Sequence, residues 1–320
     1  MKKALDVVTV GEALALFIAE TPGPLHAVSR FARAPAGAEL NVAVGLSRLG
    51  LRTGYISALG QDNLGDDLLS FMHSEGIDCT HVVRDTANPT GLMFKTRQQD
   101  SSDPVTEYFR RGSAASRLAI TPDVLDYAAQ ARHLHVSGVA VAVSESLREL
   151  VFALAEQAGK LGQTVSFDPN LRPSLWPNEA EMVKTLNALA TRVDMVMPGL
   201  AEGRLLTGHT APRSIADFYL DRGAKHVVIK LGAEGAYAAD RFGHVQVPGL
   251  RVPRVADTVG AGDGFAAGVI SGLLNDLSLA EATRRGNAIG ARVVQFPGDS
   301  DGLPHRHELI QMMEALDAHG

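Results

Sequence analysis

Short apolar segments alternate along the chain with longer segments in which leucine and alanine recur at helical spacing. This alternation predicts an α/β fold, with a mostly parallel Rossmann-like sheet that is covered by helices on both faces. Several apolar segments end in Gly, Asp, Asn or Pro, which is typical of strands whose carboxyl ends line a ligand crevice. We expect strands at residues 6–11, 53–60, 133–139, 164–170, 194–199 and 226–232, and helices at 39–49, 64–74, 144–161, 178–190, 201–207, 213–222, 261–274 and 279–294.

Two segments depart from this alternation and carry turn signals instead of a helical apolar face. Residues 14–35 contain Thr-Pro-Gly-Pro, and residues 91–111 contain Asp-Ser-Ser-Asp-Pro, which are combinations that favour turns. We interpret them as two β-hairpins that form a small lid beside an α/β core made of residues 1–13, 36–90 and 112–320. The alternative is that both segments are edge strands of the main sheet.

Composition excludes several classes of protein. Hydrophobic residues make up 45% of the chain and charged residues 21%, as in ordinary globular proteins, and the net charge of −6 argues against a nucleic-acid partner. A single cysteine, Cys79, excludes an internal disulfide framework. No stretch approaches the roughly 20 apolar residues of a membrane span, and the N-terminus does not have the pattern of a signal peptide. We therefore expect a cytoplasmic protein without a membrane partner.

A run of small residues around one acid is the strongest candidate for chemistry. Gly260, Ala261, Gly262 and Asp263 precede an apolar segment, 265–274, that reads as a buried helix. Backbone N–H groups in the first turn of a helix have no intrahelical partner, so glycines there allow an anion to approach them closely. The run therefore predicts a phosphate cradle that contains a catalytic acid. The alternative is that Asp263 only complements the helix dipole. Walker A, metalloprotease and nucleophile-elbow patterns are absent.

The segment "DTVGAGDGFAAG" (257–268) resembles the C-terminal signature of the ribokinase-like (PfkB) carbohydrate kinases, D-T-x-G-A-G-D. "GAELNVAVGLSRLG" (37–50) and "ALGQDNLGDDL" (58–68) resemble the N-terminal signature, and the similarity extends from residue 6 to residue 304. The resemblance implies that Gly260, Ala261 and Gly262 form the anion hole for the transferred phosphoryl group, that Asp263 is the base for the sugar hydroxyl, and that Asp257 helps to organise substrate or metal. Because a helix N-terminus lowers the pKa of a carboxyl group, we expect Asp263 to be charged and a weak base.

The same resemblance implies ATP and Mg²⁺ as cofactors. "KLGAEGAY" (230–237) is similar to the nucleotide loop of the family. A family motif, P-N-x-x-E, organises magnesium through water, and this chain keeps Glu202 but has Gly199 in place of the Asn. The residues implied at the nucleotide are Asn170, Lys230, Gly232, Gly235 and Asn287, and Glu202 is the one implied at the metal.

The sugar site resembles that of the family members that phosphorylate 2-keto-3-deoxygluconate. The resemblance rests on "EYFRRGSAASRL" (107–118) and "FDPNLRPSLW" (167–176), whose arginines would face a sugar carboxylate, for which guanidinium is a well-matched partner. In this lid strand Met93 stands where the family often has an aromatic residue, and Phe94 does not replace it because neighbours on a strand face opposite ways. The residues implied at the sugar are Glu12, Gly37, Asn41, Tyr108, Arg110, Arg172 and Asp257.

Three alternatives remain open for the function. Kinases for 5-keto-2-deoxygluconate and for fructose share the fold, and a catalytically silent sugar-binding regulator belongs to a different class. The retained residues Gly260 to Asp263 and Lys230 argue against the regulator. Arg110 and Arg172 could also be exposed surface residues. The edges of the lid sheet could be covered by a second subunit, so we expect a homo-oligomer that assembles through the lid.

Overall fold

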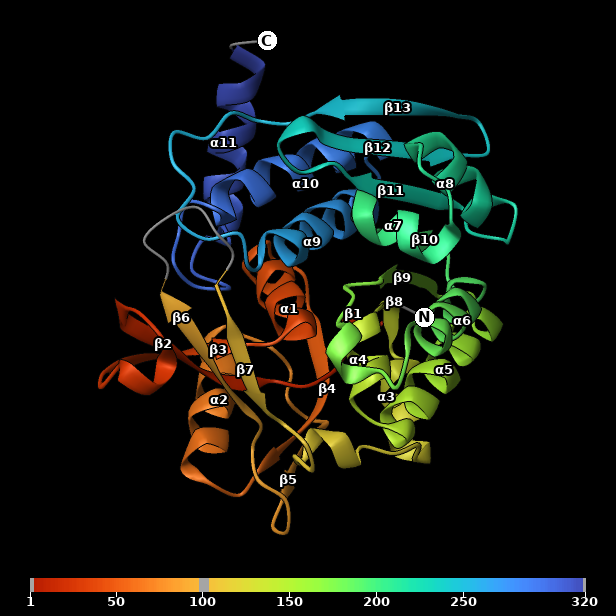
Figure 1. Ribbon diagram of the computed structural model, residues 1–320. Coiled ribbons are helices and arrows are strands. Elements are labelled where there is room, and N and C mark those ends of the chain that lie inside the picture. The colour runs from red at the N-terminus through yellow and green to blue at the C-terminus, as the bar shows by residue number, and fades with distance from the viewer. Residues whose placement is uncertain (1–2, 98–103, 319–320) are drawn as a thin grey trace.

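The computed structural model describes residues 3–97 and 104–318. Within them, the main sheet has nine strands in the order β13-β12-β11-β10-β9-β8-β1-β4-β5 (Figure 1). The strands from β11 to β5 pair in parallel, and β12 and β13 add to one edge in antiparallel pairing. The strands span β1 (Leu5–Val10), β4 (Thr53–Gly60), β5 (Val82–Asp85), β8 (Ala131–Ser137), β9 (Thr164–Asp168), β10 (Met195–Val196), β11 (His226–Lys230), β12 (Gly235–Asp240) and β13 (Gly243–Pro248).

Helices cover both faces of this sheet, and the strands are apolar on both sides as a result. In β11, Val227 and Ile229 belong to one hydrophobic cluster, while Val228 between them belongs to the cluster on the other face. The first face carries α3 (Pro122–Ala128), α4 (Gly138–Val143), α5 (Glu145–Lys160), α6 (Glu179–Ala190), α7 (Leu200–Thr207) and α8 (Pro212–Leu220). The second carries α1 (Ala38–Arg48), α2 (Asn63–Ser74), α9 (Ala261–Leu274), α10 (Leu279–Val293) and α11 (Arg306–Ala318).

The helices begin where the sequence supplies a cap. The Asp62 side chain accepts a hydrogen bond from Gly65 N at the start of α2, and Ser144 does the same for Leu147 N in α5. Ser278 and Glu281 form a reciprocal capping box at α10. Helix α9 packs against α10 so closely that a Cβ added at Gly268 would lie 2.7 Å from Gly286 Cα. Of the described helices, none is long and apolar enough to cross a membrane.

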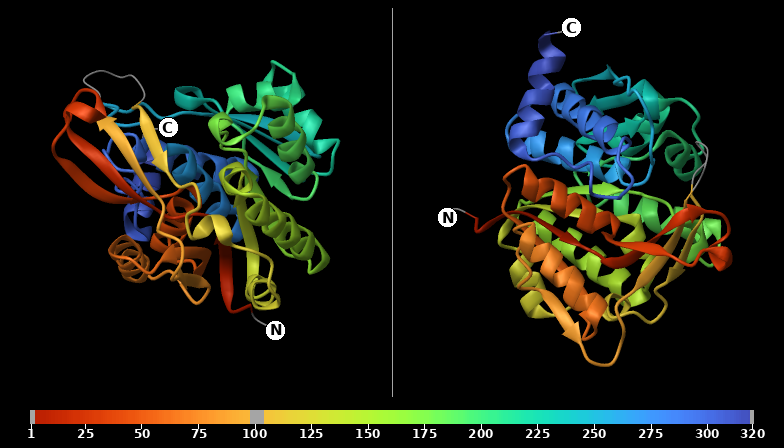
Figure 2. Two further views of the ribbon diagram at one scale, coloured as in Figure 1. Left: turned by 60° about the horizontal axis from the view of Figure 1, so that its bottom comes forward. Right: turned by 90° about the vertical axis from the view of Figure 1, so that its left-hand side faces the viewer.

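A separate four-stranded sheet stands beside the main one, as Figure 2 shows from two sides. It contains β2 (Leu14–Pro22), β3 (Phe31–Ala36), β6 (Leu92–Arg97) and β7 (Thr106–Phe109) in the order β3-β2-β6-β7. Each pair β2–β3 and β6–β7 is an antiparallel hairpin, and β2 pairs with β6 in parallel. The two predicted hairpins are therefore present, and the alternative of edge strands in the main sheet is wrong. Residues 98–103 of the predicted lid lie outside the described residues.

The two faces of this small sheet differ in chemistry. Met93 and Lys95 on β6 are buried against the rest of the protein. Phe94 between them points the other way and contacts three phenylalanine rings at centroid distances of 5.2 to 5.8 Å, those of Phe17, Phe31 and Phe109. This opposite orientation of neighbouring residues agrees with the expectation that Phe94 does not take the place of Met93.

Candidate active site

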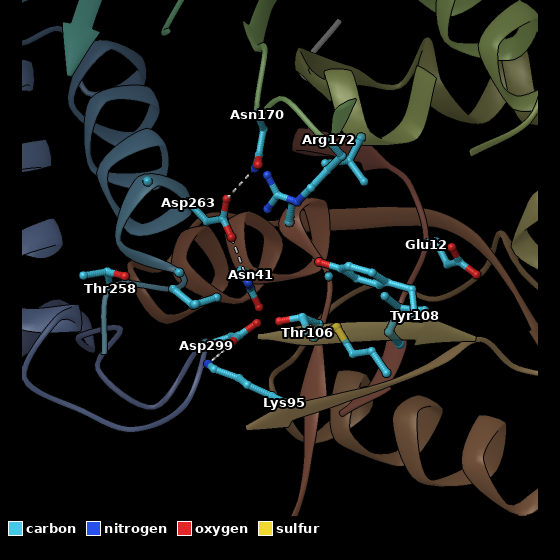
Figure 3. Close-up of a pocket in the computed structure, with 18 of the residues that line it drawn as sticks. Glu12, Asn41, Lys95, Thr106, Tyr108, Asn170, Arg172, Thr258, Asp263 and Asp299 are labelled. Carbon is cyan, nitrogen blue, oxygen red and sulfur yellow. Dashed lines mark hydrogen bonds and ion pairs between the residues drawn. The ribbon is translucent and has the colours of Figure 1, made fainter. Parts of the chain in front are cut away.

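A cavity of about 360 Å³ lies at the carboxyl ends of β1 and β9, between the small sheet and the first turns of α1 and α9 (Figure 3). Such a position, outside the carboxyl ends of parallel strands, is where ligands bind in open α/β sheets. The lining contains most of the predicted site residues: Glu12, Gly37, Asn41, Tyr108, Arg110, Asn170, Arg172, Glu202, Lys230, Gly260, Gly262 and Asp263. Segments far apart in the sequence therefore meet in one site.

The first turn of α9 has the geometry of an anion cradle. Gly260 caps the helix with a φ of +80°, and a Cβ there would lie 2.2 Å from Asp299 O, so only glycine fits. Ala261 is the first helical residue. A Cβ added at Gly262 would lie 3.4 Å from Lys230 Nζ, which places an ammonium group beside the turn. The free N–H groups of a helix start and a neighbouring cation together suit a phosphate group.

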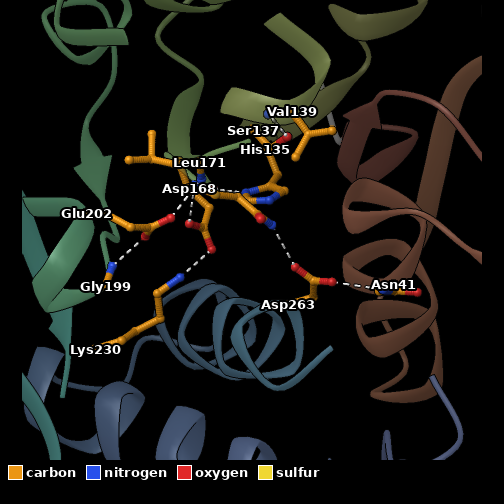
Figure 4. Close-up of polar contacts among 12 residues, drawn as sticks. Asn41, His135, Ser137, Val139, Asp168, Leu171, Gly199, Glu202, Lys230 and Asp263 are labelled. Atoms are coloured by element: carbon orange, nitrogen blue, oxygen red, sulfur yellow. Dashed lines mark hydrogen bonds and ion pairs between the residues drawn. The ribbon is translucent and has the colours of Figure 1, made fainter. Parts of the chain in front are cut away.

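Asp263 is held at both of its carboxylate oxygens. Asn41 Nδ2, from α1, donates to Oδ2 at 2.8 Å (Figure 4), and Asn170 Nδ2, from the loop after β9, donates to Oδ1 at 3.2 Å (Figure 3). The side chain is buried, and this burial raises its pKa to about 8. The expectation of a lowered pKa is therefore wrong, because desolvation of the carboxylate outweighs the hydrogen bond from Asn41 and the charges of Lys230 and Arg172, which act to lower the pKa. A buried carboxyl group with a raised pKa is a stronger base once it is ionised.

Asn170 adopts a left-handed backbone conformation, with a φ of +37°, which is uncommon for a residue other than glycine. Its N–H donates to Asp168 Oδ1 at 3.1 Å, and the other oxygen of Asp168 accepts a hydrogen bond from Lys230 Nζ at 2.6 Å. Asp168 thus holds the backbone of Asn170, whose side chain contacts Asp263, and the Lys230 ammonium group beside the cradle. Sequence reasoning missed Asp168, although its place at the end of a predicted strand marks it as a candidate.

Glu202 connects two segments of the site through its carboxylate. Oε1 accepts from Leu171 N at 2.7 Å, and Oε2 accepts from Gly199 N at 2.7 Å. The side chain therefore joins the loop after β9 to the start of α7, and each oxygen already has a backbone donor. Among the described residues, no group of three or more His, Cys, Asp or Glu side chains is placed to hold a metal ion.

Two arginines line the cavity, Arg110 beside Glu12 and Arg172 close enough to Asp263 that its charge acts to lower the pKa of that carboxyl group. Arg110 is buried, and its Nε donates to Glu12 Oε2 at 2.6 Å, while Ser113 Oγ donates to Glu12 Oε1 at 2.5 Å. Glu12, predicted at the sugar, thus holds the guanidinium group through one nitrogen, which leaves the terminal amino groups for a ligand. The Arg110 guanidinium carbon lies 5.6 Å from the centre of the Tyr108 ring. Arg172 lines the same cavity and donates from Nη1 to Leu171 O at 2.8 Å.

Several predicted residues lie outside the lining of this cavity. Gly232 and Gly235 form the turn between β11 and β12, and Asn287 Nδ2 donates to the carbonyls of Val247 and Pro248 at the end of β13. Asp257 lies before the cradle, where its Oδ2 is 2.5 Å from Lys95 Nζ. The structure brings Met93, Lys95, Thr106 and Asp299 to the cavity as well, none of which was predicted as a site residue. No local sequence pattern distinguishes these four.

Comparison with known proteins agrees with this geometry. Residues 4–306 match the family described as pfkB family carbohydrate kinase. A 2-dehydro-3-deoxygluconokinase of Bacillus subtilis (strain 168) is 50% identical over 312 residues, which cover 97% of this chain and 96% of the relative. A 5-dehydro-2-deoxygluconokinase of Geobacillus kaustophilus (strain HTA426) is 31% identical over 319 residues, 98% of this chain and 95% of the relative.

A solved structure is similar over the same span. The crystal structure of a PfkB protein from Polaromonas sp. JS666 superposes with a TM-score of 0.89 at 48% identity, and the match covers 96% of this chain and 99% of that one. The family match, the relatives and the solved fold all extend over nearly the whole sequence. The chain therefore belongs to the pfkB family of carbohydrate kinases.

Proposed function

We propose that the protein transfers the terminal phosphoryl group of ATP to 2-keto-3-deoxygluconate (2-dehydro-3-deoxygluconate), giving 2-keto-3-deoxy-6-phosphogluconate. The assignment of the substrate rests on two arginines, Arg110 and Arg172, in the cavity that also contains Asp263. A guanidinium group matches the carboxylate of a sugar acid, and a neutral sugar makes no use of it. The name of the relative at 50% identity supports the same substrate.

The reaction follows from the placement of these groups. The sugar acid would lie with its carboxylate at the arginines and its terminal hydroxyl at Asp263, which takes the hydroxyl proton as the oxygen attacks phosphorus. Asn41 and Asn170 fix the direction of the Asp263 carboxylate. The N–H groups at Gly260 to Gly262 and the Lys230 ammonium group would stabilise the charge on the transferred phosphoryl group. Positioning and charge stabilisation provide most of the catalysis in such reactions.

Magnesium fits this site as a companion of the nucleotide. The two oxygens of Glu202 each hold a backbone N–H, and Asp168 holds Lys230, so the protein offers no open cage of carboxylates in the described residues. Mg²⁺ usually keeps several waters and binds substrate phosphates, so this donor set is compatible with it. Glu202, which lines the cavity, would bind the ion through water. When bound, the ion would neutralise phosphate charge.

A panel of substrates tests this function. ATP consumption is measured with 2-keto-3-deoxygluconate, 5-keto-2-deoxygluconate and fructose, with wild type and Arg172→Ala. A charge-assisted hydrogen bond contributes on the order of 1.5–3 kcal/mol, so we expect the KM for the preferred acid to rise about 10- to 100-fold in the variant. Activity with a neutral sugar should change much less. Arg213→Ala, at an exposed position on α8, is the matched control.

The panel also separates the alternatives. The arginines would accept the carboxylate of 5-keto-2-deoxygluconate as well, and the relative at 31% identity is named for that substrate, so a higher kcat/KM for this acid would replace the proposal. Equal losses on charged and neutral sugars in Arg172→Ala would assign Arg172 to the nucleotide phosphates. No turnover of any sugar would favour a silent regulator.

The assembly state is a separate proposal. Phe109 on β7 is 58% exposed, and it belongs to the phenylalanine cluster on the outer face of the small sheet. Burial of such rings would favour a homo-oligomer formed through this sheet. Analytical ultracentrifugation of wild type and Phe109→Lys tests it. We expect the variant to shift toward the monomer, and a monomeric wild type would refute the proposal.

A further inference from the structure

Lys95 lies on the small sheet, but its ammonium group bonds to the other part of the protein. Its side chain is 3% exposed, and Nζ lies 2.5 Å from Asp257 Oδ2. Nζ also lies 3.2 Å from Asp299 Oδ1, as Figure 3 shows. Asp257 and Asp299 are 12% and 4% exposed. A buried cation between a buried carboxylate, Asp299, and a partly buried one, Asp257, is expensive to desolvate unless the geometry is maintained, so the contact fixes all three groups together.

The two acids belong to the two segments that build the phosphate cradle. Asp257 begins the turn that leads into α9, and its Oδ1 accepts a hydrogen bond from Val259 N at 3.0 Å. The carbonyl of Asp299 packs against Gly260, the residue that caps α9. A displacement of either acid would therefore move the N–H groups that face the phosphoryl group.

Lys95 is also next to the residues that face the sugar acid. On β6 it shares a side with Met93, which pairs with Tyr108 of β7, and Arg110 follows directly after that strand. Lys95 itself lines the cavity. The side chain thus extends from the strand pair that carries the sugar-acid residues to the turns that carry the phosphate residues.

We propose that Lys95 is a positioning residue that links sugar-acid binding at the small sheet to the geometry and charge of the phosphate cradle. Its ammonium group neutralises one of the two carboxylate charges beside the cradle and holds both turns in place. A sugar acid that fixes β6 and β7 also fixes Lys95, and through it the cradle. The inference rests on the proposed function in one respect, namely that the sugar acid binds beside Arg110.

The first test measures the coupling between the two ligands. The Kd of a non-hydrolysable ATP analogue is determined by calorimetry with and without saturating sugar acid. In wild type we expect the sugar acid to lower this Kd by about 5-fold or more, within the usual range of coupling between sites. We define the coupling ratio as the Kd of the ATP analogue without sugar acid divided by its Kd with sugar acid. In Lys95→Ala this coupling ratio should fall to within about 2-fold of one. The kcat should fall about 10- to 100-fold because an additional negative charge faces the phosphoryl group.

A matched control separates this role from a general contact between the two sheets. Arg33 on β3 bonds Asp67 on α2 at 2.7 Å, so this pair also joins the small sheet to the α/β core, but at an exposed site that is not part of the cavity. Arg33→Ala should keep the wild-type coupling ratio and kcat. Coupling that disappears equally in both variants would overturn the assignment to Lys95.

Chemical rescue separates positioning from stability. Propylammonium supplies the atoms that Lys95→Ala removes, and 1-propanol is the uncharged comparison. We expect millimolar propylammonium, and not 1-propanol, to restore the coupling ratio and part of kcat in the variant and to leave wild type unchanged. Lys95→Gln, which is one atom shorter but keeps an uncharged NH2 donor, is measured in the same way if Lys95→Ala does not fold, and it should lose the coupling ratio.

The outcomes decide the proposal. A wild type without coupling, or a Lys95 variant with wild-type coupling, overturns it. If wild type prefers another sugar in the substrate panel, the proposed substrate fails, but the coupling test with that sugar still decides the role of Lys95.

Discussion

Replacement of Asp263 by Asn should abolish turnover and also stabilise the fold at alkaline pH. In the unfolded chain the carboxyl group keeps its ordinary pKa of 3.8, whereas burial raises the pKa of Asp263 to about 8 in the folded protein. Between these values the folded protein binds a proton that the unfolded chain does not. The contribution of Asp263 therefore makes the free energy of unfolding fall as the pH rises from 4 to 8.

The magnitude follows from the size of the shift. At 1.36 kcal/mol per pKa unit, a change from 3.8 to about 8 corresponds to about 6 kcal/mol of instability above pH 8. Asn at this position has no charge to desolvate, but only one of its atoms can accept from Asn41 or Asn170, and the lost hydrogen bond costs about 1–3 kcal/mol. We expect the variant to be about 3–5 kcal/mol more stable than wild type at pH 8.5, and equal or slightly less stable at pH 4.5.

Urea unfolding at several pH values between 4.5 and 8.5 measures this difference. Asp217→Asn, an exposed aspartate on α8, is the matched control and should show no such trend. In parallel, kcat should fall by about 10²–10⁴ in Asp263→Asn, and wild-type kcat/KM should rise with pH toward 8 as the base ionises. A stability difference that is constant over this range would refute the protonated Asp263, and a near-normal kcat would refute its role as the base.

Three further predictions concern the cradle, Glu202 and the small sheet. Gly260→Ala should lower both kcat and the melting temperature, because its Cβ would overlap Asp299 O, and wild-type values in both assays would contradict the cradle geometry. Glu202→Gln should lose one of two backbone hydrogen bonds and about 1–3 kcal/mol of stability, and the rate should need a higher Mg²⁺ concentration; an unchanged Mg²⁺ dependence would exclude Glu202 from a role at the metal. Crystals with and without sugar acid and an ATP analogue should show the small sheet displaced about Gly91 and Gly112, and an immobile sheet would exclude a lid.

The sequence predicted most of the main sheet and its helices because burial on both faces leaves a strong apolar signal. The six predicted strands and eight predicted helices are present, with ends displaced by a few residues. Strands β5, β12 and β13 were missed. β5 has only four residues, β12 ("GAYAAD") is buried but consists mostly of Gly and Ala, which favour strands weakly, and β13 ("GHVQVP") is exposed along most of its length. β12 pairs with β11 and β13 pairs with β12 through backbone hydrogen bonds, which no side-chain pattern reveals.

The residues of the site also differ in how far local sequence predicts them. Local signals correctly predicted that Asp263 and its glycines lie at the start of a helix, since a helix start can be recognised within a few residues of sequence. The raised pKa of Asp263 could not be predicted from local sequence. Asn41, Asn170 and the other residues that bury the carboxyl group come from distant segments of the chain. For the same reason the hydrogen bonds of the Glu12 carboxylate with Arg110 and Ser113 could not be predicted, and its contact with the sugar stays a prediction.

The close packing of α9 against α10 limits how this enzyme can diversify. Because Gly268 and Gly286 leave no room for a side chain between the two helices, they behave as one rigid block that fixes the position of Asp263. New substrates therefore cannot be accommodated by a shift of α9. We expect changes of specificity to arise instead in β6 and β7. Substitutions at positions such as Met93 would alter the cavity without moving Asp263.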